Sequence, residues 1–340
     1  ISDGQYVADV VAEFARHQEY ENALLASLDD LKNRDFEKIE ARFERARRVG
    51  VCDSLQHYEY FEQLEKRTEQ RKALAAGLIA PNGITTGIAD LDRCLKEKGW
   101  GRAQLSLLMG AAKKGKSAHL GFFARNAVYA GYNVLLVTLE ISTEIISERL
   151  DSSVANIPVM EIPTRIVDTH TSVKAAFGIR KPGKLYIEDF SSEAFKPKTL
   201  TRLLERYKAH GVKFDMIVID YLDIMEPDRH GKTDIEDSKS IYKAVRRIAV
   251  AENAALLSAT QTNRTGASAL VADDTHVAED FNRIRIADIV ISINSTQEEM
   301  DNGESRLFFA ASRNQRGKFT LRVKCDMSTM NPITSVIGRE

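Results

Sequence analysis

The chain has 340 residues, of which 43% are hydrophobic and 29% are charged, and its formal net charge is −1. This composition is typical of a soluble globular protein with one large core and an appendage. It excludes a basic nucleic-acid coat protein, so any nucleic acid would have to bind a local positive patch. Cys52, Cys94 and Cys325 form no metal-binding spacing, and no apolar run approaches a membrane span in length. We expect reduced thiols and no contact with a membrane.

Residues 1–80 are predicted to form a helical N-terminal region that ends in a linker helix. They contain no proline and are rich in Glu, Arg, Lys, Ala and Leu. Apolar residues recur at helical spacing in stripes, at Val7 to Phe14, Leu24 to Leu31, Phe36 to Ala46 and Tyr58 to Leu64. A small bundle without chemistry would explain these stripes. An amphipathic helix that docks on a neighbouring subunit is equally consistent with them.

The sequence Ala80-Pro81-Asn82-Gly83 is typical of a turn and marks a domain boundary. Beyond it, residues 81–340 alternate between apolar strands and helices. The strands are predicted at 104–109, 133–138, 184–187, 215–219, 255–259, 288–293, 306–310 and 319–325. The helices are predicted at 117–130, 143–154, 197–210 and 235–252. This order predicts an α/β fold with a mainly parallel sheet covered on both faces, and the last two strands suggest an antiparallel hairpin at one edge. Ligands of such sheets bind beyond the carboxyl ends of the strands.

Residues 110–117 read GAAKKGKS, which matches the phosphate-binding loop G-x-x-x-x-G-K-[ST]. The match lies between an apolar strand and a helix, where unpaired helical N–H groups attract anions. Lys116 is expected to reach the β- and γ-phosphates, and the Ser117 hydroxyl to hold Mg²⁺. We therefore expect nucleotide contacts from Gly110, Ala111, Ala112, Lys113, Lys114, Gly115, Lys116, Ser117 and Ala118.

Two carboxylates follow other predicted strands. MIVID at 216–220 ends in Asp220, which is expected to hold a water ligand of Mg²⁺ close to Ser117. Glu140 follows the strand after the phosphate loop, where it could polarise the attacking water. Asp223 could assist or could be a solvated loop acid, and the sequence does not decide between the two.

Two further polar clusters lie near strand ends. Gln261 follows another apolar strand, and its amide could sense the γ-phosphate if that strand neighbours the one carrying Asp220; an ordinary polar loop is the alternative. Arg313, Arg316 and Lys318 lie far along the chain from the phosphate loop. In a ring of subunits an arginine here could reach the neighbour's γ-phosphate, since a planar guanidinium suits phosphate. A basic surface turn explains the same residues without chemistry.

The complete set of motifs resembles one family, the C-terminal ATPase domain of DnaB-type ring helicases, which is a branch of the RecA-like P-loop ATPases. The resemblance covers about residues 84–330. It rests on the combination of TGIADLDRCL (86–95), GAAKKGKS (110–117), VTLEIS (137–142), IVIDYLDIM (217–225), QTNR (261–264) and SRNQRGKF (312–319).

The resemblance implies an ATP- and Mg²⁺-dependent helicase that forms a hexameric ring, moves on single-stranded DNA and unwinds duplex in replication. A primase or loader is implied as a further partner, and the cytoplasm of a bacterial or phage-infected cell as the location. Glu140 matches the catalytic glutamate, Gln261 the sensor, and Arg313 the arginine finger that acts across the interface. Residues 55–76 most resemble the linker helix that docks on the adjacent subunit.

Three departures from the family pattern stand out. Ala311 replaces the lysine of the K-x-R finger, so Arg316 or Lys318 would have to supply that charge. The aligned DNA loop lacks its R-E-S-G sequence, and the candidate nucleic-acid contacts are Arg264, Glu279, Arg283 and Arg285. The N-terminal region is shorter than usual, as expected for a truncated, phage-type or divergent member.

Two other readings stay open at this point. One is a RecA/RadA/KaiC-like ATPase without helicase activity that acts in recombination or as a nucleotide-driven assembly. The other is a structural assembly with nucleotide as interface glue. Retention of both Glu140 and Asp220 argues against the second reading, because a site that does not hydrolyse has no use for a carboxylate that orients water.

Overall fold

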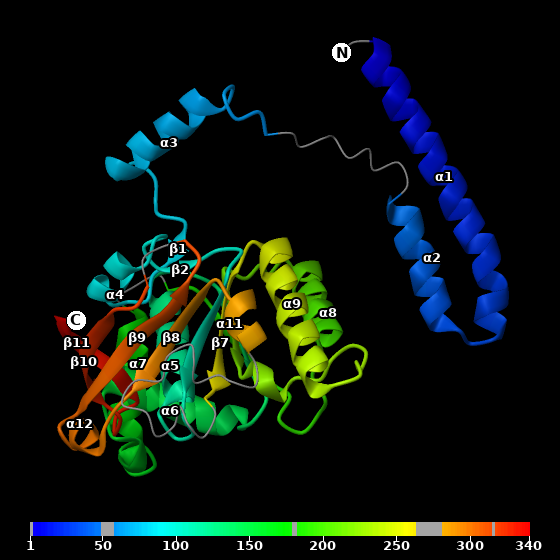
Figure 1. Ribbon diagram of the computed structural model, residues 1–340. Coiled ribbons are helices and arrows are strands. Elements are labelled where there is room, and N and C mark those ends of the chain that lie inside the picture. Colours follow the sequence, from blue (N-terminus) through cyan, green and yellow to red (C-terminus); the bar gives the residue numbers. More distant parts are fainter. Residues whose placement is uncertain (1–2, 49–57, 179–181, 263–280, 315–316) are drawn as a thin grey trace. The chain divides into compact units, whose positions relative to one another are not determined.

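The computed structural model describes residues 3–48, 58–178, 182–262, 281–314 and 317–340 (Figure 1). Contacts within the chain divide it into two units, Ile1–Ala80 and Pro81–Glu340. The two units are described separately below. In the described part of the chain, no helix combines the length and the apolar character needed to cross a membrane.

The N-terminal unit contains the helices α1 (Asp3–Lys32), α2 (Phe36–Arg48) and α3 (Leu64–Ala75). α1 and α2 form a hairpin, joined by an ion pair of 2.6 Å between Arg42 and Asp30. The leucine stripe of α1 stays more than half exposed at Leu24, Leu25, Leu28 and Leu31. α3 buries none of its residues and starts later than expected, so Tyr58 precedes it. The stripes thus predicted helices, but not a bundle with its own core.

The second unit is built on a nine-stranded sheet in the order β11-β10-β9-β8-β3-β7-β6-β4-β5. The six strands from β8 to β5 are parallel, and β9, β10 and β11 continue the sheet with antiparallel pairing. The strands span Leu105–Gly110 (β3), Val134–Thr138 (β4), Leu185–Asp189 (β5), Met216–Asp220 (β6), Ala255–Gln261 (β7), Ile289–Asn294 (β8), Glu304–Ser312 (β9), Thr320–Asp326 (β10) and Asn331–Arg339 (β11). A separate pair joins β1 (Gly83–Ile84) to β2 (Trp100–Gly101).

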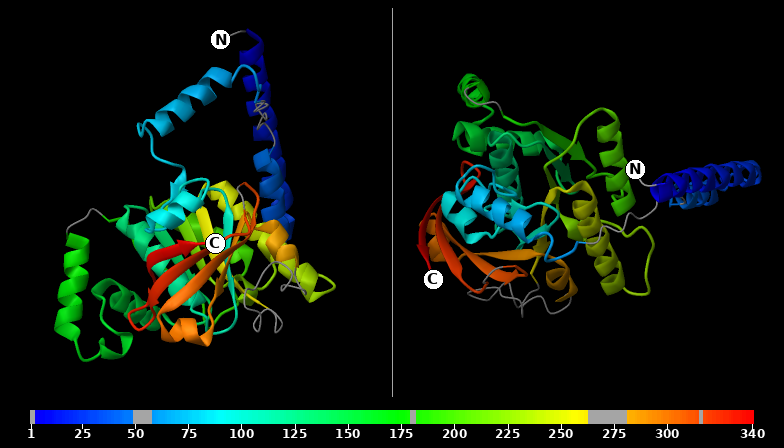
Figure 2. Two further views of the ribbon diagram at one scale, coloured as in Figure 1. Left: turned by 60° about the vertical axis from the view of Figure 1, so that its left-hand side comes forward. Right: turned by 90° about the horizontal axis from the view of Figure 1, so that it is seen from above.

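Helices cover both faces of this sheet (Figures 1 and 2). They span Ala89–Cys94 (α4), Lys116–Tyr129 (α5), Thr143–Ala155 (α6), Ile166–Gly178 (α7), Pro197–Ala209 (α8), Asp234–Glu252 (α9), Phe281–Ile286 (α11) and Gln297–Asp301 (α12), with single 3-10 turns at Val159–Glu161 and Leu222–Ile224. Successive residues of a strand face opposite sides. Leu108 therefore packs with α5 on one face, whereas Leu107 and Met109 pack with α8 and α9 on the other.

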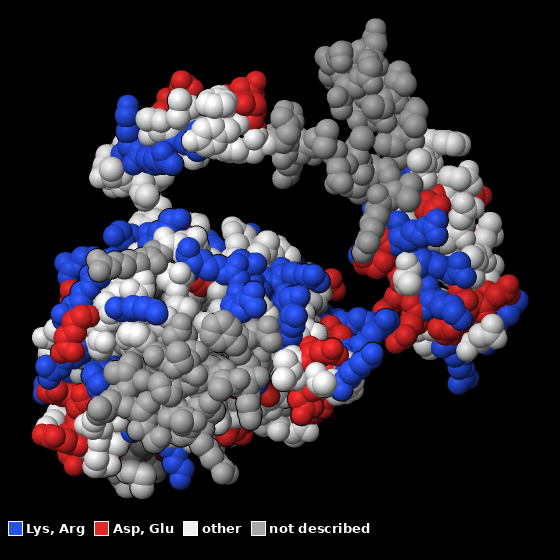
Figure 3. Space-filling model, in the orientation of Figure 1, with Lys and Arg blue, Asp and Glu red and all other residues white. Residues whose placement is uncertain are grey.

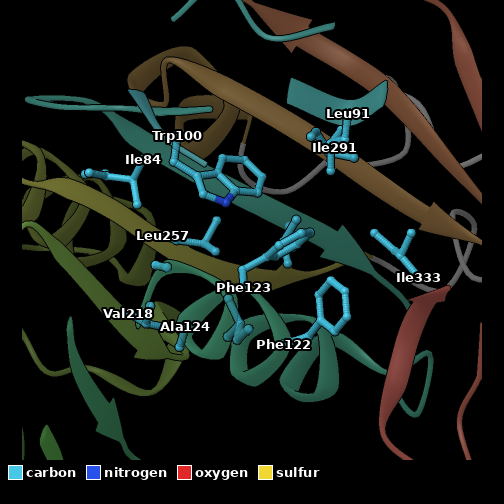
Figure 4. Close-up of a cluster of buried hydrophobic side chains, with 14 of the residues drawn as sticks. Ile84, Leu91, Trp100, Phe122, Phe123, Ala124, Val218, Leu257, Ile291 and Ile333 are labelled. Carbon is cyan, nitrogen blue, oxygen red and sulfur yellow. The ribbon is translucent and has the colours of Figure 1, made fainter. Parts of the chain in front are cut away.

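Aromatic side chains anchor α5 to the sheet (Figure 4). Phe123 meets Trp100 edge to face at 5.0 Å between ring centroids, and Phe122 at 5.5 Å. All three rings are buried. Because such pairs add to the stabilisation from buried apolar area, they hold the middle of α5 against β2.

The expected α/β fold with a mainly parallel sheet is confirmed. Each predicted strand and helix beyond Gly83 matches an observed one to within a few residues. β9 and β10 do form an antiparallel pair, but β11, which the sequence did not indicate, takes the edge position. Helix α7 was also not predicted.

Candidate functional site

The glycine loop joins the end of β3 at Gly110 to the start of α5 at Lys116. Gly115 has a φ of 76°, and a Cβ there would lie 2.8 Å from the Cε of Met327. The positive φ therefore favours glycine here, whereas the flexible end of the exposed Met327 side chain could move away from a Cβ. Burial lowers the pKa of His119 to about 4, so its imidazole is neutral, and its Nδ1 lies 2.9 Å from the Gly115 carbonyl oxygen. The start of α5 is thus shaped as an anion site.

Lys116 is almost fully buried at the base of the loop. Its Nζ donates to the carbonyl oxygens of Gly110 at 3.0 Å and Ala111 at 2.9 Å. Burial lowers the pKa of Lys116, and the nearby charges of Asp223, Asp220 and Glu140 oppose that shift. The amine is therefore held next to three carboxylates, at the carboxyl ends of the parallel strands.

Asp220, the last residue of β6, is 3% exposed and accepts a hydrogen bond from the Ser117 side chain. Its Oδ1 has no hydrogen-bond partner. Burial raises the pKa of Asp220, the charge of Glu140 raises it further, and the Ser117 contact lowers it. An unpartnered buried carboxylate oxygen beside a hydroxyl is the kind of oxygen pair that Mg²⁺ accepts when water and phosphate complete its shell. These two residues therefore fit the expected ion.

The described residues contain no cluster of three or more His, Cys, Asp or Glu side chains suited to a metal. A complete protein cage for a cation is thus absent from the described part of the chain. Mg²⁺ commonly needs only one or two protein oxygens, so this finding agrees with the Ser117 and Asp220 pair.

Glu140 lies two residues beyond β4 and is exposed. After burial itself, its charge is the largest influence that raises the pKa of Tyr221, and it also acts on Asp220 and Lys116. Glu140 is therefore near enough to Lys116 and Asp220 to act on their charges, and its side chain is exposed.

Gln261 ends β7, which lies between β3 and β6. It stands opposite Gly110 in the parallel register, so the strand order required for a sensor is present. Its Nε2 donates to the Tyr221 hydroxyl at 2.9 Å, and its backbone N–H donates to Asp223 at 3.1 Å. The amide thus connects the glycine-loop strand to the strand end that carries Asp220.

Asp223 is not a solvated loop acid. Its side chain is 14% exposed and pairs with Arg283 at 2.8 Å. It also accepts from the Tyr242 hydroxyl at 2.6 Å and the Thr260 hydroxyl at 3.1 Å. These contacts of Asp223 could not be predicted from the sequence, because its partners Thr260, Tyr242 and Arg283 lie on β7, α9 and α11, far apart along the chain.

Arg313 lies at the opposite end of the sheet from the glycine loop. It follows β9, whose last residue Ser312 pairs with Ile289 at the start of β8, whereas Gly110 is the last residue of β3, at its carboxyl end. Its guanidinium donates to the carbonyl oxygens of Ala287 and Ile286, both at 3.1 Å, and to that of Arg285. Within its own subunit, therefore, Arg313 is separated from the glycine loop by the length of a strand.

A basic pocket of about 440 Å³ surrounds Arg313, with Lys243, Arg246 and Arg247 of α9 in its lining. Arg246 forms a two-bond ion pair with the buried Asp288. Lys243 and Arg247 are exposed, and in the described residues no carboxylate pairs with either of them. Figure 3 shows Lys and Arg side chains gathered over α9 and α11.

The four predicted nucleic-acid contacts have different outcomes in the structure. Arg264 and Glu279 lie outside the described residues. Arg283 points inward, with its ion pair to Asp223 and a hydrogen bond of 3.1 Å to Ser238, so we do not retain it as a nucleic-acid contact. Arg285 is exposed and stays a candidate.

The glycine loop, the buried Asp220 and the strand order define the class: a nucleotide-binding protein with a RecA-like P-loop fold. The family model described as the DnaB-like helicase C terminal domain matches residues 83–273, which is more than half of the chain. The chain belongs to this family.

Relatives and solved structures are similar at low sequence identity. A DnaB-like replicative helicase of Enterobacteria phage T4 is 23% identical over 205 residues, which are 57% of this chain and 42% of that protein. The matched part thus spans less than half of that relative's length. A solved ATPase domain superposes with a TM-score of 0.68 at 17% identity, covering 79% of this chain and 98% of that one.

Two further solved structures share the fold. A DnaB-like replicative helicase, solved to study its interactions with primase, gives a TM-score of 0.67 at 16% identity and covers 95% of this chain and 78% of that one. A KaiC-like protein from the archaeon Pyrococcus horikoshii gives 0.50 at 16% identity, covering 76% of this chain and all of that one. The match to the KaiC-like protein is thus the weaker of the two.

Proposed function

We propose that this chain is the ATPase motor of a ring helicase that moves on single-stranded DNA and unwinds duplex DNA during replication. Membership of the DnaB-like family and the name of the phage T4 relative support this proposal. The observation that carries it is the division of charge along the sheet. Lys116, Asp220 and Glu140 lie at one end and Arg313 at the other, as a site shared between neighbouring copies requires.

In one subunit, the N–H groups at the start of α5 and the Lys116 amine would bind the phosphates of ATP. Ser117 and Asp220 would hold Mg²⁺, the latter through a water ligand. The bound ion supplies charge neutralisation between the β- and γ-phosphates. Glu140, exposed beside these groups, would orient the attacking water and accept its proton.

The neighbouring subunit would supply Arg313, whose guanidinium would stabilise charge on the γ-phosphate in the transition state. Such a finger requires subunits to assemble in a homo-oligomeric ring, which we propose to be a hexamer. Gln261 would sense whether the γ-phosphate is present. Its bonds to Tyr221 and Asp223 would pass that state to neighbouring strands.

Single-stranded DNA would contact Arg264, Glu279 and Arg285, which flank or belong to the segment after β7. We place these contacts in the ring centre, where one loop from each subunit can track a phosphate backbone. A primase or loader remains part of the proposal through the family, and no residue of this chain is assigned to it.

The proposal is tested by ATP hydrolysis and strand displacement on forked DNA. Oligo-dT should increase the hydrolysis rate, and the wild-type protein should release the displaced strand only with ATP. Mass measurement with a non-hydrolysable ATP analogue and oligo-dT should give one defined oligomer, larger than the monomer.

The second candidate is a KaiC-like ATPase without helicase activity, which the similar fold of the archaeal KaiC-like protein favours. The absence of the R-E-S-G sequence at Ala278–Phe281 points the same way. DNA-independent hydrolysis by a ring that releases no strand would support this candidate and overturn the helicase proposal.

A further inference from the structure

Arginine contacts hold the short helix α11 at its middle and at its carboxyl end. It packs on α9 (Figure 1). Arg283, in its middle, reaches toward the strand ends that carry Asp220 and Gln261. The carbonyl groups at its end reach Arg313. The helix therefore connects the two ends of the sheet that the proposed catalytic site uses.

On the first side, Arg283 is fixed by several partners at once. It pairs with Asp223 at 2.8 Å, and it donates to Thr260 and Ser238, each at 3.1 Å. Its guanidinium also lies 5.7 Å from the ring centroid of Tyr242. Because Asp223 also accepts the backbone N–H of Gln261, a single carboxylate joins the candidate sensor to α11. A planar guanidinium with this many partners has little freedom to rotate.

On the second side, the end of α11 orients Arg313. The last carbonyl groups of a helix have no partners within the helix and attract cations. Here the carbonyls of Arg285, Ile286 and Ala287 accept from Nε and Nη2 of Arg313. The buried Asp288, two residues beyond the helix, adds an ion pair of 3.6 Å to the same Nε. No described residue accepts from its Nη1, so this edge of the guanidinium is available to an outside oxygen.

We propose that Arg283 is a positioning residue that acts through α11 on Arg313. The Asp223–Arg283 pair fixes α11 to the sensor strand of one nucleotide site. The end of α11 then holds Arg313 in the orientation that serves the nucleotide of the next subunit. This inference rests on the proposed function, since it requires Arg313 to act across an interface. Its new content is that Arg283 influences the neighbour's hydrolysis rather than its own subunit's.

Rings assembled from two different variants show whether Arg283 acts on the neighbour's hydrolysis or on that of its own subunit. The Lys116→Ala variant keeps Arg313 but lacks a working loop, whereas the Arg313→Ala variant keeps the loop but lacks the finger. Rings assembled from both should regain ATP hydrolysis.

We then add Arg283→Met to one variant at a time. In a mixed ring the Lys116→Ala chain supplies the working Arg313. Arg283→Met in that chain should reduce the regained rate about tenfold or more, as misplacement of a catalytic group does. In the Arg313→Ala chain it should change the regained rate less than about twofold.

Each outcome has a defined meaning. Equal loss in both arrangements, or greater loss in the Arg313→Ala chain, overturns the inference and makes Arg283 a structural or same-site residue. If the two parent variants regain no activity on mixing, the finger itself fails, and the inference fails with the proposed function. Arg93→Met is the matched control, because Arg93 also forms an ion pair within a six-residue helix, α4. It should leave both mixtures unchanged.

Folding is monitored by thermal melting of each variant and by its binding of a fluorescent ATP analogue. If Arg283→Met does not fold, Arg283→Lys takes its place, since it keeps the charge but loses the multiple donors. A severalfold loss confined to the Lys116→Ala chain is then expected. The same rate in both arrangements contradicts the inference.

Discussion

The two ends of the parallel sheet differ in charge and in how that charge is held. At the carboxyl ends of the strands, Lys116 lies among Asp220, Asp223 and Glu140. At the amino ends, Arg313 lies in a basic pocket with Lys243 and Arg247, and the buried Asp288 pairs with Arg246. One end thus has acidic groups and a phosphate loop. The other has a cluster of cations around one buried carboxylate: Asp288 pairs with Arg246 and, at 3.6 Å, with Arg313, whereas no described carboxylate pairs with Lys243 or Arg247. In the proposed ring, the two ends would complement each other between neighbouring copies of the chain.

The largest effect should come from the carboxyl end. Lys116→Ala removes the amine that lies among the three carboxylates and contacts the loop carbonyls. We expect ATP hydrolysis to fall at least about 10³-fold, because binding and charge stabilisation are both lost. Steady-state hydrolysis measures this, with Lys208→Ala, a surface ion-pair variant, as the control. Hydrolysis above one tenth of the wild-type rate would contradict the role of Lys116 at the carboxyl end of the sheet.

The next effect tests the amino end. Arg313→Ala should lower kcat by about 10³ to 10⁵, the range typical of arginine fingers. Binding of a fluorescent ATP analogue to the loop should stay within about twofold, because Arg313 is far from its own subunit's loop. Loss of binding with kcat preserved would show that Arg313 supports the fold or the loop instead.

A smaller effect should come from the cations beside Arg313. The double variant Lys243→Ala/Arg247→Ala removes two exposed charges from the basic pocket. We expect kcat to fall several-fold, about 1 kcal/mol, because these charges are solvated and add only general attraction for phosphate. Raising the salt concentration should reduce the difference from wild type. A loss as large as that of Arg313→Ala would assign one of these residues a direct contact.

The smallest effect concerns pH and the buried Asp220. Its pKa is raised in the folded state by burial, so the folded chain binds this proton more tightly than the unfolded chain. Stability from this group is therefore greatest below its ordinary pKa of 3.8 and declines as pH rises through the window up to the raised value. Asp220→Asn removes the titration.

The melting temperature of Asp220→Asn relative to wild type, without nucleotide, should thus be higher at about pH 8 than at about pH 4, because only the wild-type protein loses the stability of the buried, protonated carboxyl as the pH rises. Thermal melting at both pH values measures this. The Asp228→Asn variant at an exposed position serves as the control. A relative melting temperature that falls with pH would mean that the folded protein stabilises the charged carboxylate of Asp220.

The residues that meet at the carboxyl end of the sheet could be predicted from the sequence, but those at the amino end only in part. Buried strands read as apolar runs, and the residues that follow parallel strands must meet at one edge, so Lys116, Asp220, Glu140 and Gln261 could be brought together from their positions alone. The contacts of Asp223 and of Arg313 could not be predicted in this way. They depend on which side chains meet across separate elements, and a single sequence does not contain that information.

Missed elements have local causes. β11 begins with Asn331-Pro332 and has Ser335 and Gly338 within it, all of which weaken a strand pattern; at the edge of a sheet they are tolerated. α7 contains Ile166, Val167 and two threonines, which lower helix propensity. In the N-terminal unit the apolar stripes between Val7 and Ala46 predicted helices correctly, whereas most of the Tyr58–Leu64 stripe precedes α3. Periodicity also does not reveal that the Leu24–Leu31 stripe stays exposed.

The central claim, that one catalytic site combines the carboxyl end of one copy with the amino end of the next, is tested most directly by mixing two inactive variants. Lys116→Ala and Arg313→Ala should each hydrolyse almost no ATP alone. After mixing and reassembly, the rate should rise and pass through a maximum at comparable amounts of the two chains. A mixture that is never faster than the sum of its separate components would contradict the account.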